Sequence, residues 1–174
     1  MNTLNGKLIQ LRALEPEDLE FLFLTENNSS FWEISHTLVP FSKFLIKQYL
    51  ENAHLDIFEA KQLRLIIQEN KNNTPVGMID LFDFNPKHKR AGVGILIHKE
   101  FQQSGFASEA LALIIKHSFN YLNVHQLYAN ITVDNNNSVA LFKKHHFKEI
   151  GIKKDWIFSE GKFKDEIILQ LINE

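Results

Sequence analysis

The stretch Phe101-Gln102-Gln103-Ser104-Gly105-Phe106-Ala107 is the most informative part of this chain. Residues 91–97 before it are almost all apolar, as in a covered strand, and residues 108–122 after it have helical periodicity. A strand, a turn of small residues and a helix start together form a place where several backbone N–H groups point the same way. Such a place binds phosphate, because the first N–H groups of a helix lack internal partners and the helix dipole adds positive potential.

The segments around this turn predict a single mixed domain. Two strands, joined by a polar turn at 70–74, precede the strand at 91–97 and form a hairpin. A Pro and three acidic residues at 15–18 open a helix, and 31–41 is an irregular aromatic segment. The predicted strands are 7–12, 63–68, 76–84, 91–97, 126–132 and a final hairpin through 156–158 and 167–171, and the other predicted helices are 43–52, 108–122 and 135–146.

Composition excludes several classes of protein. The 174 residues suit one domain spanning 1–174, and 44% of them are hydrophobic, as in globular proteins. The formal net charge of −2 gives no electrostatic basis for nucleic acid as a partner. The absence of Cys excludes disulfides and a Cys nucleophile, and no His spacing matches a zinc site, so we expect no metal.

Membrane and export signals are not evident. No apolar run approaches the roughly 20 residues that span a bilayer, and the first seven residues lack the apolar core of a signal peptide. We therefore expect a cytoplasmic protein without a membrane partner.

A second motif is Asn135-x-x-Ser138-x-x-Leu141-Phe142-x-Lys144-x-His146-Phe147. Asn135 can cap a helix by accepting N–H bonds, and Leu141 lies two turns in, facing the sheet. Taken alone, this segment is an ordinary capped helix.

The two motifs together resemble the GCN5-related N-acetyltransferase (GNAT) family. Gln102-x-x-Gly105-x-Ala107 is similar to the family's (Gln/Arg)-x-x-Gly-x-(Gly/Ala) motif, and the second motif is similar to Asn-x-x-(Ser/Ala)-x-x-Leu-Tyr-x-Lys-x-Gly-Phe. Both stand in the family's order with a strand between them. Residues 11–18 and 80–91 are similar to the branch that includes spermidine (diamine) and ribosomal-protein N-acetyltransferases.

The resemblance implies a fold and an activity. The implied fold is α/β, with a mixed, mainly antiparallel sheet, helices on both faces and a splayed acetyl-CoA cleft between strands 91–97 and 126–132. The implied activity is transfer of acetyl from acetyl-CoA to a diamine or polyamine, a protein N-terminus or another small amine. Relatives range from monomers to large rings, so a homo-oligomer is also consistent with the resemblance.

The resemblance also implies cofactor contacts. Backbone groups of the strand through Ile95, Leu96 and Ile97 would pair with the pantetheine arm and meet the thioester carbonyl. The remaining contacts that it implies are Gln102, Gln103, Ser104, Gly105, Phe106, Ala107, Asn135, Phe142 and Lys144. The alternative is that Asn135 is only a helix cap and that Lys144 is only a solvated charge.

Three residues are candidates for proton transfer. An ammonium must lose a proton before it attacks, and Asp80 and Asp83 are the acids on the strand before the cofactor strand. Period-two alternation places them on opposite faces unless a bulge intervenes, so we expect one in the cleft, Asp83 before Asp80. The alternative role for each carboxylate is an exposed charge at the strand end or a salt bridge to Arg90 or Lys89. Ser138 is the candidate acid for the departing thiolate, as proposed for the corresponding Ser of ribosomal-protein relatives, and an ordinary polar residue in the first turn of the helix is its alternative role.

Two aromatic residues, Phe31 and Trp32, are candidates for lining an acceptor pocket, with core packing as the alternative for one of them.

Some positions depart from the family pattern. Phe142 stands where the family often has a Tyr taken as the acid, and Gly92 stands where relatives often carry a strand Glu that acts as base through water. His146 replaces the usual Gly. Residues 37–40 lack the Glu-Glu-Pro of spermidine acetyltransferases, which weakens the expectation of a polycation as substrate.

Two other functions compete with an acetyltransferase. The losses at Phe142 and Gly92 fit a non-catalytic acyl-CoA-binding or sensing domain. A nucleotide-binding module would use the same turn, but the chain has neither Gly-x-Gly-x-x-Gly nor Gly-Lys-Ser/Thr, and the strands before the turn look like an antiparallel meander.

Overall fold

The computed structural model describes residues 4–174, which form one seven-stranded sheet with the strand order β1-β2-β3-β4-β5-β7-β6. Strands β4 and β5 run parallel, and every other neighbouring pair is antiparallel. The mixed, mainly antiparallel sheet predicted from the sequence is therefore confirmed. The strands are β1 (Ile9–Arg12), β2 (Leu63–Glu69), β3 (Thr74–Asn85), β4 (Arg90–Ile97), β5 (Gln126–Thr132), β6 (Lys148–Ser159) and β7 (Lys162–Ile172).

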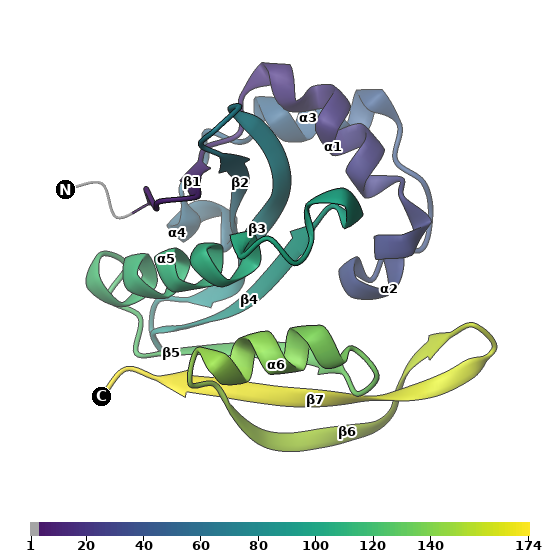
Figure 1. Cartoon of the computed structure of the whole chain (residues 1–174), viewed down its shortest axis with the longest axis vertical. Helices are drawn as coiled ribbons and strands as arrows, with labels where there is room; N and C mark the ends of the chain where they lie inside the picture. Colours follow the sequence, from purple (N-terminus) through teal and green to yellow (C-terminus); the bar gives the residue numbers. More distant parts are fainter. Residues whose placement is uncertain (1–3) are drawn as a thin grey trace.

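Helices cover both faces of the sheet. Helices α1 (Leu19–Glu26) and α3 (Lys43–Glu51) bury Leu22 and Ile46 against Ile66 and Met78. The larger core lies on the opposite face, beneath α5 (Phe106–Asn120) (Figure 1). The remaining helical segments are η1 (Pro16–Asp18), η2 (Ser29–Phe31), α2 (Trp32–Ser35), α4 (Ile57–Ala60), η3 (Lys99–Phe101) and α6 (Asn136–Lys144).

The parallel pair β4 and β5 separates soon after it begins. Only residues 90–92 of β4 pair with residues 126–128 of β5, whereas β3 pairs with β4 as far as Ile97. Strand β5 continues instead against β7 along its whole length. The rest of β4 therefore has one edge without a strand neighbour, and Figure 1 shows the two strands diverging between α5 and α6. This is the splayed cleft that the sequence predicts.

Several boundaries differ from the sequence-based expectation. Helix α5 runs from Phe106 to Asn120 and not over the predicted 108–122. It begins two residues earlier because Gly105, directly after the turn, is its N-cap residue. The last hairpin is far longer than 156–158 and 167–171, because β6 and β7 also include the charged stretches around Lys153 and Lys164. The irregular segment 31–41 contains the short helix α2, and α4 was not predicted.

Gly92 is explained by its neighbour across the sheet. Gly92 pairs with Phe82 of β3, and a Cβ atom on Gly92 would lie 2.3 Å from the Phe82 ring. That ring also packs edge-to-face on Tyr128 of β5, with centroids 5.8 Å apart. The benzyl side chain of Phe82 thus occupies the space that a side chain at position 92 would need.

We predict that Gly92→Ala lowers the free energy of unfolding by about 1–3 kcal/mol, because the new methyl group must displace the Phe82 ring. The matched control is Gly94→Ala, where the nearest atom, in the same ring, lies at 3.9 Å. Urea unfolding of both variants measures the difference. Equal stability of the two variants would contradict the packing argument.

Candidate functional site

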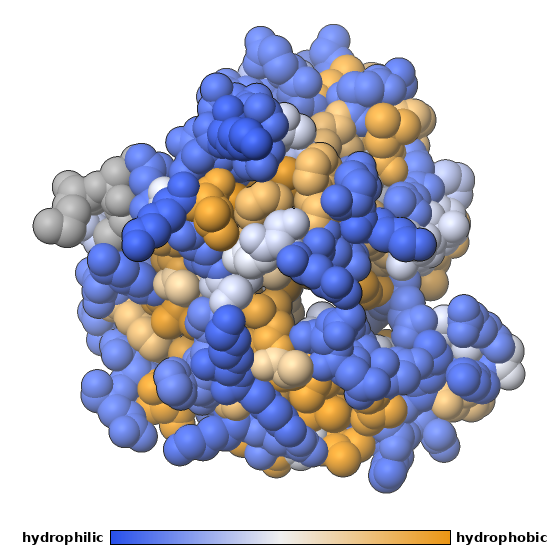
Figure 2. Space-filling view, viewed as in Figure 1, coloured by the Kyte–Doolittle hydropathy of each residue, from blue (hydrophilic) through white to orange (hydrophobic). Residues whose placement is uncertain are grey.

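Two cavities open along the cleft and meet at its middle. The first, here called the turn cavity, has a volume of about 340 Å³ and lies over residues 102–107. The second, here called the acidic cavity, has a volume of about 510 Å³ and lies over β3, β4 and the β6–β7 hairpin. They share four lining residues from α2, β4 and α6, and Figure 2 shows a hollow near the middle of the molecular face. The shared residues are Ile34, Ile95, Asn135 and Ser138.

The turn before α5 has the backbone of an anion site. Gly105 is the N-cap residue with φ of 82°, and Gln103 also has a positive φ of 60°. No side chain caps α5, so its first N–H groups are available to a ligand. The Gln102 side chain donates from Nε2 to the Ile97 carbonyl at 3.1 Å, which ties the turn to the end of β4.

The first turn of α5 is anchored to the start of the chain. The carboxylate of Glu109 accepts backbone N–H bonds from Lys7, Leu8 and Ile9 at 2.9, 2.7 and 2.9 Å. One charged acceptor thus satisfies three backbone donors at the edge of β1, and charge-assisted bonds of this kind are strong. The position of the turn is therefore fixed by the sheet edge as well as by β4.

Most of the predicted cofactor contacts lie together in the turn cavity. Ser104 and Lys144 line neither cavity, and Phe142 lines the acidic cavity instead. Phe142 is also 2% exposed and packs edge-to-face on Phe147, so it is buried more deeply than Leu141, which was expected to face the sheet. The predicted residues in the turn cavity are Ile95, Leu96, Ile97, Gln102, Gln103, Gly105, Phe106, Ala107, Asn135 and Ser138.

The acidic cavity contains both Asp80 and Asp83. The expectation that only one of them faces the cleft was wrong, because a bulge interrupts β3 between the pairs Phe82–Gly92 and Asn85–Arg90. Asp83 lies in this bulge with φ of 48°, which turns its side chain to the same side as that of Asp80.

Asp80 is part of a partly buried ion cluster. Arg64 of β2 donates from Nε and Nη2 to the two Asp80 oxygens, both at 2.8 Å, and Nη1 contacts Glu26 of α1. Burial alone would lower the pKa of Arg64, but the Asp80 carboxylate outweighs it and raises that pKa. Asp80 is thus paired with Arg64, and the suggested pairing with Arg90 or Lys89 was wrong.

Asp83 has a different environment. It is exposed, and Tyr128 donates a long hydrogen bond from its hydroxyl to the Asp83 carboxylate at 3.5 Å. Within residues 4–174, Asp83 is the one acid of this cavity without an ion-pair partner. It is therefore the carboxylate best placed to accept a proton or to bind an incoming cation.

The wall between the two cavities is built by η2 and α2. Phe31 lines the turn cavity, and Ile34 lines both cavities. Trp32 lines neither cavity, because its indole N–H donates to the Glu26 carbonyl at 2.8 Å. On its other side α2 is held by Glu33, which contacts Lys164 of β7 at 3.0 Å.

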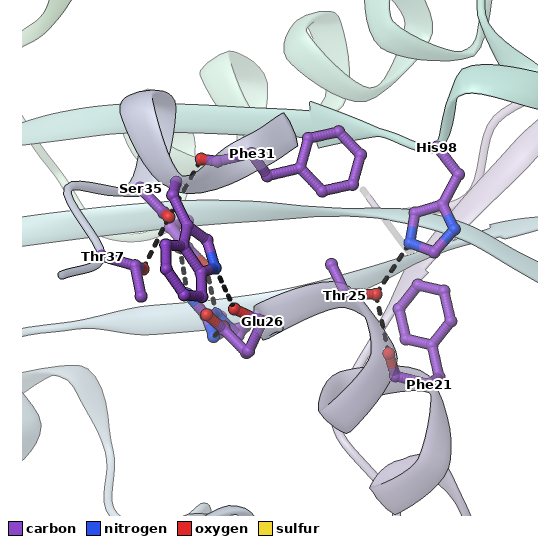
Figure 3. A network of polar contacts seen from close by, with 10 residues as sticks. Phe21, Thr25, Glu26, Phe31, Ser35, Thr37 and His98 are labelled. Carbon is purple, nitrogen blue, oxygen red and sulfur yellow. Dashed lines mark hydrogen bonds and ion pairs between the residues drawn. The ribbon is translucent and has the colours of Figure 1, made fainter. Parts of the chain in front are cut away.

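His98, directly after β4, connects this wall to α1 (Figure 3). Its ring stacks on Phe21 at 4.9 Å and packs against Phe31 at 5.7 Å. The Thr25 hydroxyl donates to the Phe21 carbonyl at 2.7 Å, so its oxygen must accept from His98 Nε2, also at 2.7 Å. Burial lowers the pKa of His98 and favours the neutral ring.

Several residues of the site were not found in the sequence. Glu33, Arg64, Lys153 and Glu166 all line the acidic cavity, but they come from four separate elements and belong to no motif. Only Arg64 had a sequence signal, as a charge between the apolar residues Leu63 and Leu65 of its strand. Among residues 4–174, no three His, Cys, Asp or Glu side chains gather closely enough to hold a metal ion, and no helix is long and apolar enough to cross a membrane.

Comparison with known proteins assigns this fold and cleft to a family. A family model described as an acetyltransferase (GNAT) domain matches residues 9–148. Spermidine N(1)-acetyltransferase from Vibrio cholerae is 30% identical over 160 residues, which cover 90% of this chain and 88% of that protein. The enzyme of the same name from Escherichia coli K12 is 26% identical and covers 91% of this chain and 83% of its own.

A solved structure shows the same fold. Spermidine N-acetyltransferase from Vibrio cholerae, crystallised in complex with CoA and spermine, superposes with a TM-score of 0.85. It is 27% identical in sequence, and the match covers 96% of each chain.

We predict that His98 makes the stability of the protein depend on pH. The lowered pKa means that the unfolded chain binds more protons than the folded one as pH falls below about 6.5. Stability that is present at neutral pH is therefore lost on acidification. His98→Phe keeps an aromatic ring between Phe21 and Phe31 but removes the titration, so its urea midpoint should fall less between pH 7 and pH 5. The other histidines remain in both proteins, and identical slopes would contradict the role given to His98.

Proposed function

Because this chain belongs to the GNAT acetyltransferase family, we propose that it transfers the acetyl group of acetyl-CoA to a primary amine at the junction of the turn cavity and the acidic cavity. The observation that carries this proposal is the meeting of two chemically different cavities at Asn135 and Ser138. One cavity has a backbone that suits phosphate, and the other has carboxylates that suit an ammonium.

The turn cavity is the proposed place of acetyl-CoA, the substrate that GNAT acetyltransferases use. The N–H groups around Gly105 would bind the pyrophosphate. Beyond Gly92, β4 has no β5 neighbour, so its backbone groups between Val93 and Ile97 are free on that side to pair with the amide groups of pantetheine. A backbone N–H in the same stretch would stabilise the charge that develops on the thioester oxygen.

The acidic cavity is the proposed place of the amine. Its lining carries four carboxylates against the two cations Arg64 and Lys153. An ammonium is drawn to such a site, but it must lose a proton before its nitrogen attacks, since its pKa is about 10. Asp83, directly or through a water, is our proposed base, because Asp80 is held by Arg64.

The proposed step is a direct transfer. The amine nitrogen forms a bond to the carbonyl carbon, the carbon–sulfur bond breaks, and the thiolate takes up a proton. Ser138 lines both cavities and is the proposed donor of that proton, since Phe142 has no proton to give. A thiol with a pKa near 8.5 is a fair leaving group, so this acid needs to contribute little.

The acceptor class follows from the relatives and from the charge of the cavity. We propose a small aliphatic amine, and diamines and polyamines are the first class to test because the curated relatives named above act on spermidine. Thiol release from acetyl-CoA with a panel of monoamines, diamines, spermidine, aminoglycosides and an N-terminal peptide measures this directly. Tight acetyl-CoA binding without thiol release from any aliphatic amine would overturn the proposal.

We predict that Gly105→Asp weakens acetyl-CoA binding by roughly 30-fold or more, because it places a negative charge at the helix N-terminus where the pyrophosphate would bind. Calorimetry measures the dissociation constant. The control is Gly161→Asp, because Gly161 also has a positive φ, of 77°, and lies in the open turn of the last hairpin. The two variants share the backbone strain but differ in position. Equal affinities would show that the turn is not the cofactor site.

We predict that Asp83→Asn lowers kcat/KM by roughly 100-fold near neutral pH, and by more as pH falls. Without a base, only the free amine reacts, and its fraction drops tenfold for each pH unit below its pKa. The comparison variant is Asp80→Asn, which breaks a pair with the partly buried Arg64 and should lower the urea midpoint as well. A pH profile of Asp83→Asn parallel to that of the unchanged protein would remove Asp83 as the base.

A further inference from the structure

The acidic cavity contains an ammonium of its own. We propose that Lys153 is a specificity-determining residue, whose ammonium occupies the place where a second ammonium of the acceptor would bind. This inference rests on the proposed function, because it concerns the acceptor side of the same site. Lys153 would thus make the protein favour acceptors with one cationic amine over diamines of the same length.

Lys153 sits between two groups that together bind alkylammonium ions. Its Nζ lies 2.8 Å from Oε1 of Glu166 and 4.5 Å from the centroid of the Trp156 ring. A carboxylate supplies a charge-assisted hydrogen bond, and the face of an indole attracts a cation. All three residues line the acidic cavity, so the place that Lys153 fills is open to the acceptor.

Glu166 depends on this lysine. Its side chain is only 3% exposed, and among the described residues Lys153 is the cation that contacts it. A buried carboxylate without a partner is costly, so the site at Glu166 requires a cation. In this protein the Lys153 ammonium is that cation, so Glu166 does not require an ammonium from the acceptor.

The backbone of β6 is bent in a way that creates this arrangement. Lys153 pairs with Glu166 and Ile157 pairs with Lys164, so three residues of β6 stand opposite Asp165 alone. Asp155 within this bulge has φ of 49°, and its N–H donates to the Asp165 carboxylate at 2.9 Å. In a regular strand, positions 153 and 156 would lie on opposite faces. The bulge brings Trp156 over the Lys153 ammonium instead.

The other charges of the cavity leave no alternative place for a second ammonium at this end. Within residues 4–174, Asp80 is paired with Arg64, and Glu33 is paired with Lys164. Asp83 is the unpaired acid, and the proposed reaction uses it for the attacking amine. The second ammonium of a diamine would therefore meet the like charge of Lys153, which opposes binding.

The test is Lys153→Met, which keeps an unbranched apolar side chain and frees Glu166 and Trp156. Each variant is assayed with alkyl monoamines and α,ω-diamines of equal length, from four to eight carbons. We expect the ratio of kcat/KM for diamine over monoamine to rise roughly tenfold at one chain length in Lys153→Met, since a bond to a charged partner is gained. An unchanged ratio at every length would overturn the proposal.

Two further variants show which group binds the second ammonium. Lys153→Met/Glu166→Gln removes the carboxylate as well, and its ratio should return to that of the unchanged protein. Glu166→Gln alone leaves Lys153 without its partner, so the ratio should fall below that of the unchanged protein. This variant also tests the proposal if Lys153→Met does not fold. Lys148→Met, an exposed lysine at the start of β6, is the matched control and should leave the ratio unchanged.

The failure of this inference is distinguishable from failure of the proposed function. Thiol release with monoamines tests acetyl transfer, whatever the role of Lys153. Calorimetric titration of the same monoamines and diamines into the CoA-loaded protein tests Lys153 without turnover. Tighter diamine binding by Lys153→Met than by the unchanged protein supports the proposal. Diamine affinity that is equal in the two proteins contradicts it, even if both are active.

Discussion

The separation of two parallel strands is the constraint on which the site depends. Strands β4 and β5 share hydrogen bonds over residues 90–92 and 126–128 and then diverge, because β5 stays paired with β7 while β4 stays paired with β3. The sheet therefore contains a gap in its own interior. Backbone groups that a regular sheet would satisfy internally are available to an extended ligand, and both cavities open along this gap.

Packing at the start of the gap determines which side chains the site can use. The Phe82 ring lies over Gly92 and against Tyr128, directly where β4 and β5 part. This packing leaves no room for a side chain at position 92, so the base proposed here lies on β3 instead. The bulge after Phe82 brings Asp83 to the cavity at nearly the same level of the sheet. The space above Gly92 and the placement of Asp83 are thus both decided next to Phe82.

The electrostatics of the acceptor side are dominated by pairs that the protein makes with itself. Arg64 joins Asp80 to Glu26, Lys164 joins Glu33 to Asp134, and Lys153 neutralises Glu166. The pair between Glu33 and Lys164 also connects α2 to the last hairpin across the cleft. The cavity is therefore acidic in composition but has few free carboxylates, which is a different environment from one built for a long polycation. A count of the carboxylates that line the acidic cavity would therefore overstate the affinity of the cavity for a long polycation.

The sequence by itself determined the parts of this protein that depend on neighbours along the chain. The turn at 102–107, the Asn135 cap and the order of strands and helices follow from local rules, because helix starts, periodicity and turn residues act over a few positions. These features carry the resemblance to the GNAT family, and that resemblance implied the splayed sheet and most of the residues that line the turn cavity.

Only the tertiary structure decided the acceptor side. Arg64, Glu33, Lys153 and Glu166 come from four elements, and their meeting depends on strand register and on two bulges that no local pattern marks. A one-residue shift turns a side chain to the other face of a sheet, which is why the placement of Asp80 and Asp83 was mispredicted. Charges so far apart in the sequence find their partners only when the sheet is assembled.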